Sequence, residues 1–187
     1  MSHASPAAIR IRALTAADAA AYKALRDETL RAAPDAFTSD HASTVTRPAR
    51  EYLARFGSLE SGRFFLGAFD AAGRLMGCVG CERDLRAKVR HTGTVVSMMV
   101  LPALQGQGIG RQLLAACVAA ARRVPGLTQL VLTVTASNPH VVRLYEQAGF
   151  KAWGLLPRAI VVDGMGYDKL HMVLVLAESP APGCRSH

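Results

Sequence analysis

Apolar and polar residues along the chain alternate in some segments and recur with helical spacing in others, and the two periods predict its elements. Residues 9–14 alternate apolar and basic side chains, as in a half-buried strand. Thr15, with Asp18 three residues later, is typical of a helix start, and Ala-rich helical sequence continues to about Ala33, before Pro34. The pattern therefore predicts a strand followed by a helix.

The next segment, residues 34–47, shows neither period. It is rich in Ser, Thr, Asp and Pro, and long segments of this kind are commonly surface loops with a functional role. We therefore interpret it as a candidate lid over a substrate site. Pro48 then stands at a first-turn position and predicts a short helix that ends near Gly57.

The rest of the chain alternates predicted strands and helices. Helices are expected from Ile109 to about Arg123 and from Asn138 to Gly149, and Asp163-Gly164 is a strong hairpin signal. The run 127–135 is almost continuously apolar and β-branched, as in a strand that is covered on both faces. Strands are expected at residues 63–70, 75–82, 92–101, 127–135, 150–162 and 167–176.

Length and composition fit one compact domain. The chain has 187 residues, of which 50% are hydrophobic, and this is enough to build one core. We expect a single domain over residues 9–177 between flexible ends at 1–8 and 178–187. No apolar stretch approaches the ~20 residues that span a bilayer, and the N-terminus lacks the pattern of a secretory signal. The sequence therefore predicts a cytoplasmic protein with no membrane partner.

The cysteines favour buried thiols over a metal or redox site. Cys78 and Cys81 form a C-x-x-C pair, but they lie in a predicted strand, where residues three apart face opposite sides. No second pair follows at zinc-like spacing. Cys117 falls on the apolar stripe of a predicted helix, and Cys184 lies in the predicted C-terminal tail. We therefore expect no metal.

The charge does not by itself identify a partner. The formal net charge is +8, yet the basic residues are spread along the chain without a run of five or more. A nucleic-acid-binding module would interleave aromatic side chains with the basic ones, whereas only 6% of the residues are aromatic. We therefore expect no nucleic-acid partner, and the positive charge would equally attract a polyanionic ligand.

A glycine-rich turn between a predicted strand and a predicted helix is the clearest candidate binding site. Unpaired amides and the positive end of a helix dipole meet there, and the missing Cβ atoms let phosphate oxygens approach the main chain. A Walker loop is excluded because Arg111-Gln112 follows Gly110, and a dinucleotide fingerprint fits poorly because Arg111 stands where its third glycine belongs. A plain turn is the remaining alternative. The turn reads Gln105-Gly106-Gln107-Gly108-Ile109-Gly110-Arg111.

Two segments resemble the signatures of the GNAT acetyltransferase superfamily. The stretch 98–114 resembles its coenzyme A signature, Q/R-x-x-G-x-G/A after a strand that ends in V-x-P. A second signature, N-x-x-x-x-x-L/F-Y-x-x-x-G-F, resembles Asn138, Leu144, Tyr145, Gly149 and Phe150 at the same spacing. The resemblance covers about residues 9–176. The ending 156–168 looks like a bacterial subgroup whose acceptors are mostly unsettled.

The resemblance implies a fold and an activity. The expected fold is of the α/β class, α+β in type: a mixed, largely antiparallel twisted sheet of about seven strands flanked by about four helices. The expected activity is N-acetyl transfer from acetyl-coenzyme A to a primary amine of a small molecule or protein, by direct attack on the thioester. The alternative is a non-catalytic sensor domain that binds acyl-coenzyme A. The sequence does not identify the amine, and a homodimer is left open.

The resemblance also places residues on the coenzyme. Met99, Val100 and Leu101 would offer main-chain groups to the pantetheine arm, with the side chains of Met99 and Leu101 in the core. Residues 105–111 would supply amides to the pyrophosphate, with a side-chain charge from Arg111. Asn138 would contact the coenzyme arm, although its position also fits a plain helix cap.

Acetyl transfer needs an acid and a base. Tyr145 keeps its proton near neutral pH, so by resemblance it would contact the coenzyme and donate to the departing thiolate, and the alternative is a core tyrosine. No acidic residue lies in the stretch 95–99, where similar enzymes often carry a glutamate. Glu82 and His171 are the candidate bases, and a water chain is the alternative.

Overall fold

The computed structural model describes residues 9–176, so the flexible ends expected at 1–8 and 178–187, and with them Cys184, lie outside the described residues. Four helices are present in that range: α1 (Ala19–Ala32), α2 (Leu53–Phe56), α3 (Ile109–Ala121) and α4 (Pro139–Gln147). The strands are β1 (Arg10–Ala13), β2 (Gly57–Ser58), β3 (Arg63–Phe69), β4 (Leu75–Arg83), β5 (Thr92–Val100), β6 (Gln129–Thr135), β7 (Lys151–Val162) and β8 (Met165–Val175).

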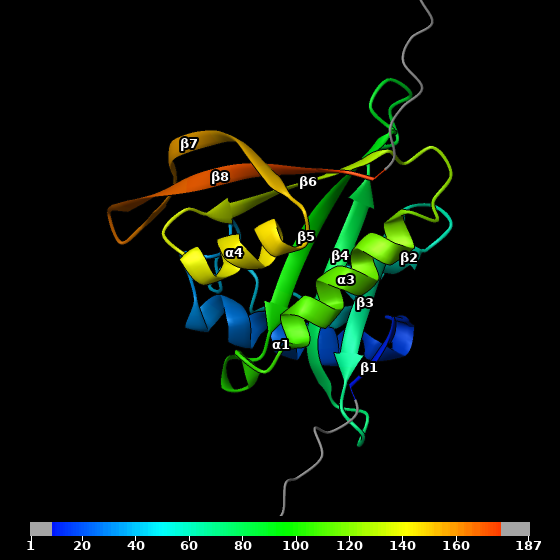
Figure 1. The fold of residues 1–187 in the computed structure, drawn as a ribbon. Helices are drawn as coiled ribbons and strands as arrows, with labels where there is room; N and C mark the ends of the chain where they lie inside the picture. The colour runs from blue at the N-terminus through cyan, green and yellow to red at the C-terminus, as the bar shows by residue number, and fades with distance from the viewer. Residues whose placement is uncertain (1–8, 177–187) are drawn as a thin grey trace, which may run out of the picture.

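One twisted sheet forms the centre of the molecule, in the order β1-β3-β4-β5-β6-β8-β7, with the short β2 beside β3. Only the pair β5 and β6 is parallel, and all other pairs are antiparallel. In Figure 1, α1 lies behind the sheet, and α3 and α4 lie in front of it. The predicted mixed, largely antiparallel sheet flanked by helices is confirmed. The pattern did not show β2, because two residues are too few to display a period.

The sheet separates two hydrophobic clusters. The larger packs beneath α3 and contains Cys81 and Cys117, and the other packs beneath α1 and contains Cys78. The two residues of the C-x-x-C pair therefore face opposite sides of β4, as predicted. All three thiols are free and buried, and burial raises the pKa of Cys78 and of Cys81 to about 12. Within residues 9–176 no cluster of His, Cys, Asp and Glu could hold a metal ion.

The start of the first helix follows the predicted pattern. Asp18 accepts hydrogen bonds from the Thr15 N–H at 2.8 Å and the Thr15 hydroxyl at 3.0 Å. Arg12 donates to the same carboxylate at 2.7 and 2.8 Å. The first turn is a 3-10 turn over Ala16–Asp18, so α1 begins at Ala19. The helix thus starts inside a small ion-pair cluster that ties it to β1.

The sheet opens between its two parallel strands. β5 pairs with β6 only from Thr92 to Thr94, opposite Gln129 to Val131, and beyond that point the two strands diverge (Figure 1). The expectation that the run 127–135 is covered on both faces is wrong in part. Leu130 and Leu132 lie in the core, whereas Thr133 on the other face is exposed, because the diverging strands leave that face uncovered.

The last two strands form the predicted hairpin. Asp163 and Gly164 both have positive φ, 49° and 81°, as a two-residue type I′ turn requires. The hairpin lies at the edge of the sheet beside α4 (Figure 1). No helix among residues 9–176 has the length and apolar character needed to span a membrane.

Candidate active site

A groove of about 1000 Å³ lies where β5 and β6 diverge. Residues 94–100 of β5 and 131–135 of β6 form its two walls. The turn before α3 and one face of α4 also line it. Its volume is at the upper end of the range of about 300 to 1000 Å³ that is typical of ligand pockets. The opening of the sheet therefore creates a space large enough for a ligand.

The glycine-rich turn lies along this groove. Gly106 and Gly108 have φ of 77° and 81°, and Gly108 is the N-cap of α3. A Cβ at either glycine would meet nothing within 4 Å, so the backbone conformation, not crowding, favours glycine here. The groove is lined by Gln105, Gly106, Gly108, Ile109, Gly110 and Arg111, and Gln107 is not among its lining residues. An open, positively polarised helix start thus faces the groove.

The groove wall on β5 contains a bulge. Cys78 pairs with Met99 and Gly80 pairs with Val96, so Ser97 and Met98 together lie opposite a single residue of β4. Ser97 has a φ of 51°, a strained conformation for a residue with a Cβ. Bulges and strained residues occur preferentially beside functional sites. The bulge therefore marks this part of β5 as a candidate reaction centre.

The three residues expected to serve the pantetheine arm differ in position. Met99 and Val100 line the groove, whereas Leu101 does not. The Leu101 N–H donates to the Met76 carbonyl at 2.9 Å, so it is not free for a ligand. The side chains of Met99 and Leu101 are buried, as predicted. Met99 is the ladder partner of Cys78 in β4 and lies two residues before Leu101, so its main-chain groups also face β4. Any main-chain pairing with a ligand therefore falls to Val100.

Helix α4 brings Asn138 and Tyr145 to the groove. Asn138 caps the helix, since its Oδ1 accepts from the Val141 N–H at 3.2 Å. The Tyr145 ring is 5% exposed and packs edge-on against Phe150. Burial raises the pKa of Tyr145 above its ordinary value, so the phenol holds its proton firmly. Tyr145 is therefore a buried side chain of the core that also lines the groove.

The two candidate bases are placed differently. Glu82 accepts from Arg55 at 2.8 and 3.1 Å and does not line the groove. His171 lines the groove from β8, opposite Thr133 of β6, and its ring lies 5.2 Å from that of Trp153. Of the two, only His171 is positioned to receive a proton from a molecule in the groove.

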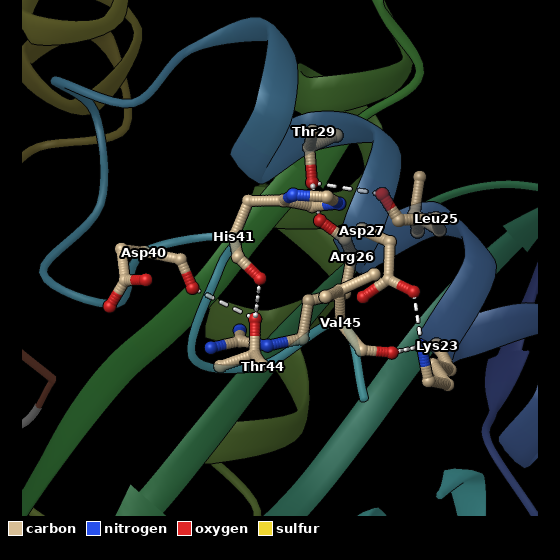
Figure 2. A network of polar contacts seen from close by, with 9 residues as sticks. All are labelled: Lys23, Leu25, Arg26, Asp27, Thr29, Asp40, His41, Thr44 and Val45. Atoms are coloured by element: carbon tan, nitrogen blue, oxygen red, sulfur yellow. Dashed lines mark hydrogen bonds and ion pairs between the residues drawn. The ribbon is translucent and has the colours of Figure 1, made fainter. Parts of the chain in front are cut away.

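The segment 34–47 forms turns, as expected from its lack of a period, but it is anchored to the body of the protein. Lys169 donates to the Ala36 carbonyl at 2.9 Å and to Thr135 Oγ1 at 2.8 Å. Thr135 in turn donates to the Asp35 carbonyl at 2.6 Å. Near the end of the segment, Lys23 of α1 donates to the Val45 carbonyl at 2.8 Å (Figure 2). Residues 35–39 line the groove.

Two lining residues were missed by the sequence analysis. Lys169 is 6% exposed on β8, and burial lowers its pKa. No sequence signal distinguished this lysine, because β8 also carries Asp168 and His171. Arg26 of α1 is 7% exposed and lines both the groove and a smaller neighbouring cavity. Its position on the buried stripe of α1, together with Tyr22 and Leu25, was the signal that could have indicated it.

Comparison with known proteins places this geometry among acetyltransferases. Residues 23–150 match the sequence profile of the Acetyltransferase (GNAT) family. The mycothiol acetyltransferase of Salinispora tropica is 38% identical over 89 residues, which are 48% of this chain and 29% of that protein. The L-methionine sulfoximine/L-methionine sulfone acetyltransferase of Salmonella typhimurium is 36% identical over 86 residues, 46% of this chain and 50% of that protein. The chain thus spans half or less of both relatives.

The fold is also shared with a protein solved together with acetyl-CoA. The structure of yncA from Salmonella typhimurium with its cofactor acetyl-CoA superposes with a TM-score of 0.81 at 26% identity. The superposition covers 95% of this chain and 99% of that one. The architecture that creates the groove is therefore common to both.

Proposed function

This chain belongs to the GNAT acetyltransferase family, and on that premise we propose that it binds acetyl-coenzyme A in the groove and transfers the acetyl group to a primary amine of a small molecule or protein. One observation carries the proposal. The glycine-rich turn 105–111 opens α3 beside a groove to which Tyr145 also contributes. The proposed phosphate-binding turn and the proposed proton donor thus share one groove, as transfer from coenzyme A requires.

The residues of the groove fit a long, polyanionic ligand. A Cβ on Gly106 or Gly108 would meet open space beside the positive end of α3, so a phosphate can approach the main chain there, and the side chain of Arg111 adds a charge. A single charge at a helix terminus contributes only about 0.3 to 1 kcal/mol, so several amides must act together on a pyrophosphate. The diverging wall of β5 then leaves Met99 and Val100 beside an extended arm.

The reaction needs one proton removed and one supplied. Acetyl-coenzyme A supplies an activated thioester, whose carbonyl carbon forms a bond to the amine nitrogen while its bond to sulfur breaks. Tyr145 is the residue placed to protonate the departing sulfur, because it lines the groove with its phenol protonated. The nitrogen must lose a proton, and His171 on the same groove, or a water molecule, takes it.

The acceptor is expected to approach past residues 35–39, which line the groove. An acceptor amine of low pKa would need little help from a base. An α-amine has a pKa of ~7.7 to 8, compared with ~10.4 for a lysine side chain. This difference supports a reaction in which no carboxylate base is required.

We also propose that the protein acts in the cytoplasm. The three free thiols of the described chain are typical of a reducing compartment, and this supports the cytoplasm. A homodimer stays a prediction, which the molar mass of the protein in solution tests.

Release of free thiol from acetyl-coenzyme A, measured against a panel of amines, tests the proposal. We expect thiol release that depends on one class of amine. Calorimetric binding of acetyl-coenzyme A without thiol release for any amine would instead favour the sensor domain.

A further inference from the structure

Arg26 is a buried cation without a partner. Arg26 is 7% exposed, and its Nε atom is buried and makes no hydrogen bond. No carboxylate among residues 9–176 lies within ion-pair distance of it, whereas Arg12 and Arg55 each have one. An unpaired buried charge is costly, so buried charges are normally paired. Arg26 is therefore a candidate binding group for an anion from outside the described chain.

A polar cavity of about 500 Å³ lies at this arginine. It shares Arg26, Arg55, Thr38 and Ser39 with the groove, so the two spaces meet. Figure 2 shows the Arg26 side chain extending from α1 toward Thr44, which also lines the cavity. A molecule held in this cavity can therefore extend its other end into the groove.

A second group in the cavity wall also lacks a partner. The Tyr52 hydroxyl is buried with no hydrogen bond, and Tyr52 lines the cavity. The Arg26 guanidinium lies 5.8 Å from the Tyr52 ring. Two residues that each carry an unsatisfied polar atom thus line one cavity, Arg26 from α1 and Tyr52 from the 3-10 turn Ala49–Tyr52. This pairing is rare in a native protein unless a ligand completes it.

The acidic residues that line the cavity do not neutralise Arg26. Asp40 accepts from the Ser43 N–H at 2.7 Å and from the Ser43 hydroxyl at 2.6 Å, so its oxygens are engaged in a turn. Glu51 is exposed, and no ion pair joins it to Arg26. Glu82 pairs with Arg55 outside the cavity wall. The cavity lining carries Arg26, Arg47 and Arg55 together with Asp40 and Glu51. Of these five charged residues only Arg26 is buried.

We propose that this cavity binds a carboxylate of the acceptor, so that the acceptor is a small amine that carries a carboxylate, such as an amino acid. This inference rests on the proposed function of the groove. A guanidinium matches a carboxylate with two parallel hydrogen bonds, and the Tyr52 hydroxyl can donate a third. With the carboxylate at Arg26, the amine extends toward the shared residues Thr38 and Ser39 and into the groove.

The test compares each of the twenty protein L-amino acids with its methyl ester, and includes benzylamine as an amine that carries no carboxylate. Thiol release gives kcat and KM for the wild type, for Arg26→Gln, and for Arg31→Gln, an exposed arginine on the same helix. For the best amino acid we expect kcat/KM to exceed that of its ester by about 30-fold or more, mainly through KM. Arg26→Gln abolishes this preference, and Arg31→Gln keeps it.

Two further measurements separate binding from folding. Arg26→Gln removes an unpaired buried charge, so its melting temperature should not fall, and its affinity for acetyl-coenzyme A should not change. If that variant does not fold, Tyr52→Phe provides the test, since it should raise KM for the amino acid and not for the ester. Calorimetry adds a direct readout: the amino acid should bind to the wild type and not to Arg26→Gln.

The possible failures are distinguishable. Equal kcat/KM for acid and ester in the wild type, or faster turnover of benzylamine, overturns the carboxylate site and leaves the transferase intact. No thiol release with any amine overturns the proposed function. In that case amino-acid binding that depends on Arg26 still supports the site, and no binding overturns it.

Discussion

Lys169 Nζ donates a hydrogen bond of 2.9 Å to the carbonyl oxygen of Ala36, a residue 133 positions earlier in the chain. The same ammonium bonds to Thr135, which holds the carbonyl of Asp35. Strands β8 and β6 thus jointly fix the start of the 34–47 segment. Because residues 35–39 line the groove, this contact sets the shape of the wall that an acceptor would pass.

Replacing Lys169 should loosen that wall. Lys169→Met keeps a long apolar stem and removes the donor, leaving the Ala36 carbonyl without its partner. A hydrogen bond to a charged group contributes about 1.5 to 3 kcal/mol, so we expect a loss of that size in the free energy of unfolding. Hydrogen exchange of residues 35–39 should accelerate. Lys151→Met, an exposed lysine on β7, is the control, and equal exchange in both variants would show that the anchor does not hold the segment.

Gly108 should be essential for the coenzyme. Gly108→Glu places a side chain and a negative charge at the open start of α3, so affinity for acetyl-coenzyme A should fall below detection by calorimetry. Gly73→Glu is a matched control, since Gly73 also has φ of 81° and open space around its Cβ but lies in the β3–β4 turn. The two variants should lose similar stability. Undiminished affinity in a folded Gly108→Glu protein would show that the pyrophosphate does not bind at this turn.

Asp18 should make stability depend on acidic pH. The hydrogen bond from Arg12 is the main cause that lowers the pKa of Asp18 from 3.8 to about 2. A folded-state pKa below the unfolded one means that Asp18 stabilises the fold fully above about pH 4, and that this contribution disappears as the pH falls toward 2. Urea unfolding between pH 2 and 6 should show the slope, and Asp18→Asn should flatten it at a cost of about 1 kcal/mol at neutral pH. An unchanged slope would assign the acid sensitivity to other carboxylates.

The sequence predicted those elements whose signal is local. The alternation and helical spacing located the helices and all strands but one. Asp163-Gly164 predicted the hairpin because a type I′ turn needs positive φ at both central residues, and Asp followed by Gly readily adopts it. The glycine-rich turn and Tyr145 were found because each belongs to a motif of fixed spacing.

The parts that the sequence did not predict depend on contacts between distant segments. Thr133 is exposed because β5 and β6 diverge, and the hydrophobic pattern of neither strand encodes this divergence. The place of Arg26 on the buried stripe of α1 can be read from the sequence, but its cavity cannot, because the cavity depends on the packing of α1 against the 3-10 turn that carries Tyr52. The commitment of the Leu101 N–H to Met76 is likewise a matter of register between β4 and the end of β5.

The central claim is that the groove between β5 and β6 is the place of acetyl transfer, with Tyr145 as the proton donor. The most direct measurement is the single-turnover rate of thiol release for wild type and Tyr145→Phe with the best acceptor amine. Phe keeps the ring against Phe150, so melting temperature and acetyl-coenzyme A affinity should change little, while the rate should fall by about 10² to 10⁴. A wild-type rate in Tyr145→Phe, with chemistry shown to limit turnover, would contradict the claim.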